Sequence, residues 1–323
     1  MHFKLGRNHI DIHRYRKEIY APIYNSTVDL QSEYPEVYNC RGERMVFYFI
    51  RDCHTAHEPY GESDYIIWDR YNFGLKTHFY SHKSMLQTMG KPVRKYGYLC
   101  ESRAIVPEDY EIFNKYKGLE KEFDSIFTYD ERILNQLDNA RFVPYCAGYW
   151  YGKHKEGVSV KADAYGEKTK NISILSSEKT YCRMHILRKE LALKCKREHL
   201  ADTYGTFDGG RYSPIEDSLQ YYRYSIVIEN DISPYFFTEK LTSCFAAQTI
   251  PVYLGASKAD EFFNPEGMIQ IKEKDIENIA GVLKQCTKEE YERRLPAVID
   301  NYNRVISEYD KPDDWIYRKY LKK

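Results

Sequence analysis

Short apolar runs alternate with helix-like segments along the first half of this 323-residue chain. The runs that predict buried strands are Arg44–Ile50, Ser63–Asp69, Lys95–Leu99, Phe123–Thr128 and Arg141–Cys146. Helical spacing occurs at Glu108–Tyr116 and Glu131–Leu137, and we expect an aromatic-rich loop from the second strand through His82. Strands that alternate with helices in this way predict a parallel sheet.

The second half repeats the alternation. Its predicted strands are Asn171–Leu175, Leu200–Tyr204, Ser225–Ile228, Thr249–Leu254 and Met268–Ile271. Its predicted helices are Cys182–Arg197, Ser213–Tyr222, Leu241–Ala247 and Thr287–Arg304. The halves are separated by Gly152–Lys170, which is polar, rich in Gly and Lys and without periodicity. We therefore predict an α/β protein of two domains, residues 1–165 and 166–323.

Charge and cysteine usage limit the possible partners and the compartment. Lys plus Arg and Asp plus Glu both number 48, so no basic surplus indicates nucleic acid or an anionic membrane as the main partner. The sequence has no run of about 18–20 apolar residues and no apolar leader core. The eight cysteines include no CxxC pair, which is typical of reduced thiols. We expect a cytoplasmic protein with at most peripheral contact at the inner membrane face.

Charged residues concentrate at one turn, within Tyr224–Gly255. Glu229 and Asn230 follow the apolar run Ser225–Ile228, and Thr238-Glu239-Lys240 precedes the next helical pattern. Ligands of open α/β sheets bind at the carboxyl ends of strands, where helix N-termini face anions. A lysine there suits a phosphate, and carboxylates suit the hydroxyls of a sugar. The alternative is an ordinary βαβ unit with solvated charges at the helix start.

This turn resembles a known family. Glu229-Asn230, Thr238-Glu239-Lys240 and Ile250–Gly255 are similar to the signature of the α-1,3-fucosyltransferases, glycosyltransferase family 10. The resemblance implies the GT-B fold, with two Rossmann-like domains whose parallel sheets face a cleft. It also implies a GDP-sugar donor and inversion at the anomeric carbon. The N-terminal domain would bind the acceptor and the C-terminal domain the donor, and the last residues would pack back on the N-terminal domain.

The resemblance also implies roles for the residues of the turn. Lys240 would contact the phosphates and Glu239 a ribose or sugar hydroxyl, while Glu229 and Asn230 would hold donor hydroxyls or brace the loop. Thr238 would contact the donor or serve only as the N-cap of the following helix.

Two aromatic residues stand just before this threonine. Many relatives carry a tyrosine two residues ahead of it, where this chain has Phe236 with Tyr235 beside it. Both are candidates for binding the donor, and the missing hydroxyl leaves the identity of the sugar open.

Two further residues match the family less closely. Arg183 follows the strand Ile172–Leu175 and Ser176-Ser177, and its guanidinium would grip the diphosphate at two points. Arg188 and Lys189, one or two turns further on, are rivals for this role, but we expect them to face solvent. Glu101 follows a predicted strand and would act as the general base, which an inverting transfer requires. Its alternative role is to pair with a basic neighbour and hold a loop.

These observations favour transfer of L-fucose from GDP-fucose to a hydroxyl of a glycan acceptor, such as a bacterial or viral surface polysaccharide or lipopolysaccharide. A different GDP-sugar donor and a catalytically inactive sugar- or nucleotide-binding protein are the alternatives. We expect no metal and no cofactor apart from the GDP-sugar, because no DxD-type site stands out and two cationic side chains with a helix N-terminus can carry the charge of the leaving group. Cys53-His54 with His57 lacks the second ligand pair that a zinc site needs.

Overall fold

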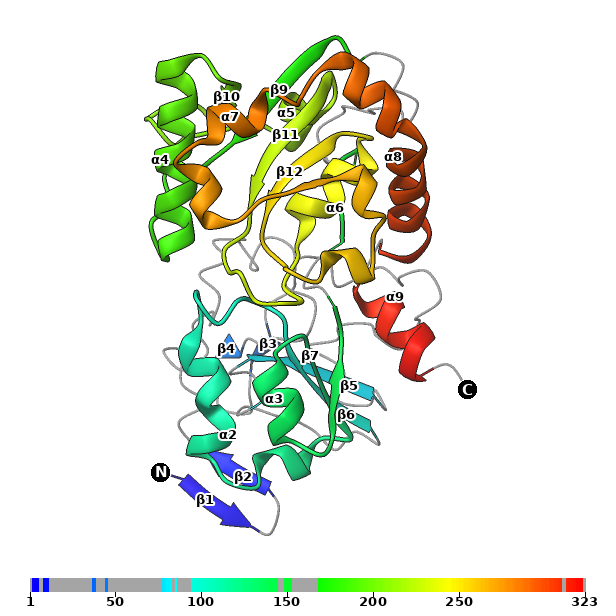
Figure 1. The fold of residues 1–323 in the computed structure, drawn as a ribbon. Coiled ribbons are helices and arrows are strands. Elements are labelled where there is room, and N and C mark those ends of the chain that lie inside the picture. The colour runs from blue at the N-terminus through cyan, green and yellow to red at the C-terminus, as the bar shows by residue number, and fades with distance from the viewer. Residues whose placement is uncertain are drawn as a thin grey trace. The chain divides into compact units, whose positions relative to one another are not determined.

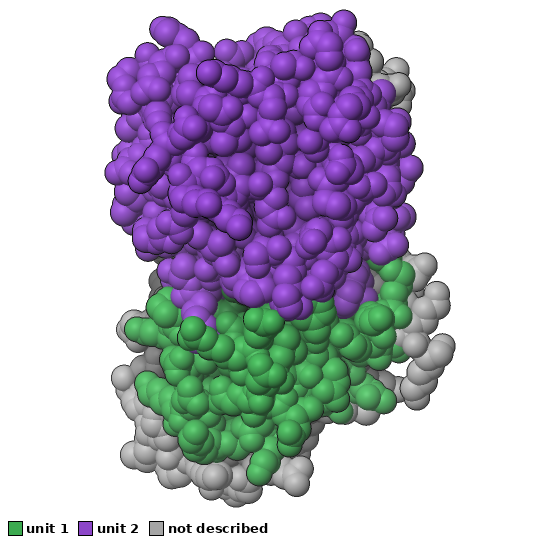
Figure 2. All heavy atoms as spheres, in the orientation of Figure 1, with its two compact units in different colours: residues 1–100, 107–143, 316–323 green, residues 101–106, 144–315 purple. Residues whose placement is uncertain are grey.

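The computed structural model describes residues 2–5, 8–11, 37–38, 44–45, 77–82, 85, 94–144, 148–152, 168–309 and 312–321. The chain divides into two compact units, which Figure 2 colours. Unit 1 consists of Met1–Cys100, Pro107–Val143 and Ile316–Lys323, and unit 2 of Glu101–Val106 and Pro144–Trp315. Each unit contains a parallel sheet, so the predicted α/β class is confirmed. The predicted boundary near residue 165 lies outside the described residues.

Unit 1 is built on a four-stranded parallel sheet whose strands follow one another in chain order (Figure 1). The strands are β5 (Thr77–Ser81), β6 (Arg94–Leu99), β7 (Ser125–Thr128) and β8 (Ala140–Phe142). The helices α2 (Ile112–Lys115) and α3 (Glu131–Gln136) stand before β7 and between β7 and β8. Two antiparallel hairpins precede the sheet: β1 (His2–Leu5) with β2 (Asn8–Asp11), and β3 (Val37–Tyr38) with β4 (Arg44–Met45).

One expectation for this unit is wrong. Thr77–Ser81 was expected within an aromatic-rich loop, but it forms the edge strand β5 and pairs in parallel with β6. Its sequence has no aliphatic residue, so it lacks the usual strand signal, yet Tyr80 is fully buried. Most of the predicted strand Arg44–Ile50 and all of Ser63–Asp69 lie outside the described residues.

Unit 2 contains a five-stranded parallel sheet in the order β10-β9-β11-β12-β13. Its strands are β9 (Lys170–Leu175), β10 (Asp202–Tyr204), β11 (Tyr222–Ile228), β12 (Ile250–Leu254) and β13 (Ile269–Gln270). Its main helices are α4 (Arg183–Glu198), α5 (Ile215–Leu219), α6 (Glu239–Ala246), α7 (Ile279–Leu283) and α8 (Lys288–Glu308). Each strand predicted here is confirmed, while α5 is shorter than predicted because Tyr222 already begins β11.

The sheet of unit 2 is covered on both faces. Successive side chains of a strand point to opposite faces, and here both sets are apolar. Tyr224, Ile226 and Ile228 of β11 enter one apolar cluster together with Leu191 of α4. Val227 points to the opposite cluster, which contains Leu241, Cys244, Phe245 and Ala246 of α6. Burial on both faces explains why these strands are nearly continuous apolar runs.

The strand order determines where a ligand site is expected. The chain runs outward from β9 to β10 and then returns to β11 on the other side of β9. In doubly wound sheets, ligands bind at the carboxyl ends of the strands where the direction of winding reverses. In unit 2 this point lies between β9 and β11, beside the segments that follow Leu175 and Ile228.

No helix within the described residues is both long enough and apolar enough to cross a membrane.

Candidate functional site

A fully buried carboxylate organises the end of β11. Glu229 is 0% exposed, and its Oε1 accepts a hydrogen bond from the Thr238 backbone N–H at 2.9 Å. Its Oε2 accepts from the Thr238 hydroxyl at 2.8 Å. Burial raises the pKa of Glu229, and the nearby Lys240 ammonium opposes that rise. Both carboxylate oxygens therefore hold the turn, and the role of Glu229 toward the donor stays a prediction.

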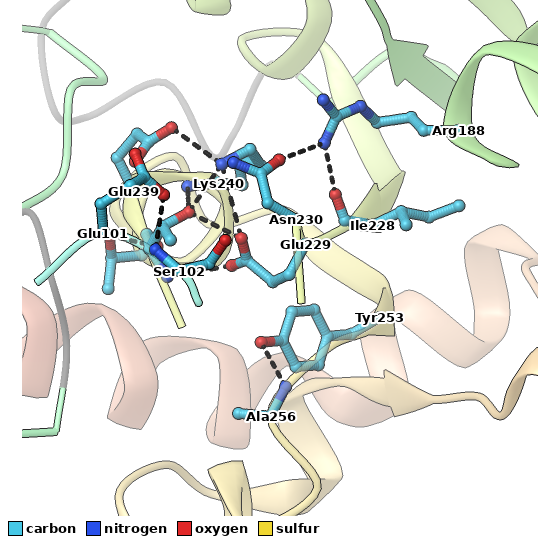
Figure 3. A network of polar contacts seen from close by, with 12 residues as sticks. Glu101, Ser102, Arg188, Ile228, Glu229, Asn230, Glu239, Lys240, Tyr253 and Ala256 are labelled. Atoms are coloured by element: carbon cyan, nitrogen blue, oxygen red, sulfur yellow. Dashed lines mark hydrogen bonds and ion pairs between the residues drawn. The ribbon is translucent and has the colours of Figure 1, made fainter. Parts of the chain in front are cut away.

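The close approach of Glu229 requires a glycine on the neighbouring strand end. A Cβ at Gly255 would lie 2.5 Å from Glu229 Cγ and 2.3 Å from the Tyr253 hydroxyl. That hydroxyl accepts a hydrogen bond from the Ala256 backbone N–H at 2.9 Å (Figure 3). Tyr253 and Gly255 therefore fix the shape of this turn.

Thr238 caps α6, as predicted for this position. Its hydroxyl accepts a hydrogen bond from the Lys240 backbone N–H at 3.3 Å, and the helix begins at Glu239. The same hydroxyl donates to Glu229, so one side chain fixes both the helix start and the buried carboxylate. A cap of this kind contributes about 1 kcal/mol to stability.

Lys240 places a cation at the start of α6. Its Nζ lies 2.9 Å from Thr238 Oγ1, 3.1 Å from Glu239 Oε1 and 3.4 Å from Glu229 Oε2 (Figure 3). A quarter of the lysine side chain is exposed, compared with none of Glu229. The lysine side chain is therefore held in place and stays partly exposed to solvent, which suits it to receive an anion.

Arg188 does not face solvent, so that expectation is wrong. It is buried and donates hydrogen bonds to the Ile228 carbonyl at 2.7 Å and to Asn230 Oδ1 at 3.4 Å. His185 lies one helical turn before it and is also buried. Burial and the Arg188 charge lower the pKa of His185 to about 4, so this ring is neutral at pH 7. Their i, i+3 spacing on α4 was the available signal that they share a face.

Arg183 begins α4, as predicted, but it lies outside the Lys240 cluster. Its guanidinium makes a two-point ion pair with Glu273, at 2.5 and 2.7 Å. The Arg183 side chain is 65% exposed, so this pair contributes little to stability. Its role at the diphosphate stays a prediction.

The two aromatic candidates differ in environment. The Tyr235 hydroxyl accepts a hydrogen bond from Lys258 Nζ at 2.6 Å, and the same ammonium lies 4.5 Å from the ring centroid. Phe236 is fully buried. For both residues, donor binding stays a prediction.

Glu101 lies two residues after the end of β6 and is half-buried. Its Oε1 accepts a hydrogen bond from the Ser102 backbone N–H at 2.7 Å. The segment Glu101–Val106 groups with unit 2, the unit that also holds Lys240, and Figure 3 draws both side chains. The structure thus brings together Glu229, Thr238, Glu239 and Lys240, and joins Asn230 to Arg188.

Within the described residues, no group of three His, Cys, Asp or Glu side chains is arranged to hold a metal ion. Cys53, His54 and His57 lie outside that part of the chain. Independence of metal stays a prediction.

Comparisons with known proteins bear on the same region. Residues 165–294 match the family model described as glycosyltransferase family 10 (fucosyltransferase) C-term. A comparison with curated proteins finds no match. An α1,3-fucosyltransferase solved with GDP is 16% identical with a TM-score of 0.41, over 62% of this chain and 65% of that chain.

Two other solved structures are similar to the same degree. An α1,3-fucosyltransferase solved with GDP-fucose is 15% identical with a TM-score of 0.40, over 68% of this chain and 77% of that one. The structure of TarM is 15% identical with a TM-score of 0.45, over 73% of this chain and 51% of that one. Residues 165–294 therefore match the C-terminal domain of glycosyltransferase family 10, the family that the run from Glu229 to Gly255 resembles.

Proposed function

We propose that this protein is an inverting glycosyltransferase that moves L-fucose from GDP-fucose to a hydroxyl of a glycan acceptor. The acceptor would be a surface polysaccharide or lipopolysaccharide of bacterial or viral type, and the reaction would take place in the cytoplasm or at the inner membrane face. The observation that carries the proposal is the cluster of Glu229, Thr238 and Lys240 at the carboxyl end of β11, within the segment that matches the family.

The cluster supports donor binding through its charge. Lys240 is positioned by Thr238 and two carboxylates, and its side chain is partly exposed. A diphosphate that approaches this face would bind the ammonium directly, and the start of α6 would add its partial positive charge. In our proposal Arg183 releases the Glu273 carboxylate and binds the diphosphate instead. Two phosphate oxygens would then accept the two hydrogen bonds that the carboxylate oxygens now accept.

Glu101 supplies the base in this proposal. Its carboxylate takes the proton of the acceptor hydroxyl while that oxygen forms a bond to C1 of the sugar. The bond between C1 and the diphosphate oxygen breaks, and GDP leaves with the electron pair. Lys240 and Arg183 stabilise the negative charge that develops on GDP, so they act mainly in the transition state.

Another GDP-sugar is a second candidate donor, and one residue favours it. Phe236 occupies the position where many relatives carry a tyrosine, and it lacks the hydroxyl that would bond to the donor. A different pattern of sugar hydroxyls would suit that change.

The test is transfer and donor hydrolysis with a panel of GDP-, UDP- and CMP-sugars, read as released nucleotide. We expect GDP release from GDP-fucose, and a loss of at least about 100-fold in turnover for both Glu101→Gln and Lys240→Ala. Activity should persist in EDTA.

Matched controls come from exposed residues of the same types. Glu108→Gln and Lys196→Ala alter a surface carboxylate and a surface ammonium outside the site and should keep full turnover. Release of GDP from another GDP-sugar alone would replace fucose by that sugar. GDP binding without turnover of any donor, with acceptor present, would refute the enzymatic proposal.

A further inference from the structure

Unit 1 holds a cysteine, a histidine and an aspartate in a line. Cys100 follows β6, and its Sγ lies 3.5 Å from His82 Nε2. The other ring nitrogen, Nδ1, lies 3.2 Å from Asp109 Oδ2. Neither the family resemblance nor the proposed transfer reaction uses this triad.

Backbone hydrogen bonding defines the protonation of the ring. The Cys100 backbone N–H donates to His82 Nε2 at 3.1 Å, so Nε2 carries a lone pair. In the neutral ring the proton therefore resides on Nδ1, on the side of Asp109. The Cys100 sulfur lies 3.5 Å from the same nitrogen, so the thiol and the backbone N–H of Cys100 share one acceptor and the thiol is within reach of a base.

The fold holds the three residues closely in place. Strands β5 and β6 are parallel neighbours, and His82 and Cys100 each follow the last residue of one of them. His82 has a φ of 51°, a left-handed conformation that is uncommon outside glycine and is often found at functional sites. Asp109 belongs to a short 3-10 helix, Pro107–Glu111, just after the turn.

Cys100 is less buried than the cysteines that the structure describes in the core. His82 and Asp109 are 0% and 1% exposed, whereas Cys100 is half-buried and reaches solvent. Cys195, Cys244 and Cys286 are buried, and burial raises the pKa of Cys195 to about 11 and of Cys286 to about 12. Those thiols are inert, because only the thiolate is a nucleophile.

We propose that Cys100 is an activated nucleophilic thiol, a site of covalent modification by soft carbon electrophiles, with His82 as its base and Asp109 as the group that stabilises the imidazolium. The sulfur forms a bond to the electrophilic carbon and the leaving group departs with the electron pair of the broken bond. The thiol proton moves to His82 Nε2 and then to water. The arrangement is that of a cysteine–histidine–aspartate triad.

The test is alkylation of the intact protein by iodoacetamide, followed by mass spectrometry of each cysteine-containing peptide with time. Cys182 is the internal control because it is also half-buried. At pH 7 we expect Cys100 to react at least about tenfold faster than Cys182, because the base raises its thiolate fraction. Equal or slower reaction of Cys100 in the wild-type protein would overturn the proposal, and no variant is needed for that result.

Two variants then test the base and its orienting group. Asp109→Asn should shift the pH dependence of Cys100 alkylation to higher pH, and His82→Gln should reduce the pH 7 rate to that of Cys182. The rate at Cys182 serves as the check on folding and should not change in either variant. If the Cys100 rate and its pH profile are unaltered in both variants, the thiol does not depend on His82 and the proposal fails.

Discussion

A lysine inside unit 2 allows a quantitative prediction of how stability depends on pH. Lys168 is buried just before β9, and its Nζ donates hydrogen bonds to the Leu219 carbonyl at 2.8 Å and to Thr249 Oγ1 at 2.9 Å. Two acceptors match the two hydrogens of a neutral amine. Burial lowers the pKa of Lys168 to about 7, from the model-peptide value of 10.5.

The sign and size of the effect follow from this difference. The unfolded chain keeps its proton up to about pH 10.5, whereas the folded chain loses it near pH 7, so above pH 7 the unfolded state binds more protons. The free energy of unfolding therefore rises with pH through this range. From about pH 7 to pH 9 the contribution of Lys168 amounts to about 2 kcal/mol.

The substitution Lys168→Met isolates the contribution of Lys168, because it keeps a long unbranched side chain and removes the titrating group. Urea unfolding followed by circular dichroism at several pH values gives the free energy of unfolding for the wild type and the variant. Because other groups titrate equally in both proteins, their contributions cancel in the difference. We expect the wild type to gain about 2 kcal/mol relative to Lys168→Met between pH 7 and pH 9.

Lys170→Met is the matched control, since Lys170 lies two residues away and is exposed. Its difference from the wild type should not change with pH over this range. A flat difference for Lys168→Met as well would refute the reasoning, because it would mean that Lys168 retains its proton in the folded protein.

Three further predictions concern the site. Gly255→Ala should destabilise the protein by about 1–3 kcal/mol and weaken GDP binding measured by calorimetry, because the added methyl group displaces Glu229. Thr238→Ala should cost about 1–2 kcal/mol in urea unfolding, and Thr238→Ser should recover most of it. Arg188→Ala should cost about 3 kcal/mol or more because it removes a buried, hydrogen-bonded charge, whereas Arg183→Ala should cost less than about 1 kcal/mol and mainly reduce turnover.

Each of these has an opposing result. Tight GDP binding by Gly255→Ala would show that Glu229 is not needed for the donor. Equal stability of Thr238→Ala and Thr238→Ser would argue against the cap. A larger loss of stability for Arg183→Ala than for Arg188→Ala would reverse the roles assigned to the two arginines.

The strands of unit 2 were predictable because each is an apolar run buried on both faces, as in Ser225–Ile228 and Thr249–Leu254. The cap at Thr238 was also predictable, because a helix cap depends on residues that are adjacent in the chain. β5 was missed because Thr77–Ser81 relies on aromatic and polar side chains rather than on aliphatic ones.

Contacts between residues that are far apart in the sequence could not be predicted from it. Arg183 pairs with Glu273, 90 residues away, and no local sequence pattern predicts that pair. Arg188 was expected to face solvent because charged residues on a helix usually do, but the Ile228 carbonyl at the strand end satisfies it. The triad of His82, Cys100 and Asp109 likewise becomes visible only when β5 and β6 lie side by side.

The route of the chain also determines the order in which the units can be finished during synthesis. Ile316–Lys323 belongs to unit 1, where the Tyr320 hydroxyl donates to the Phe142 carbonyl at 2.6 Å and its ring lies 5.5 Å from that of Phe127. A ribosome therefore synthesises all of Pro144–Trp315 before it synthesises the segment Ile316–Lys323 of unit 1. Although domains usually fold from the N-terminus first, unit 1 can be completed only after unit 2 has been synthesised.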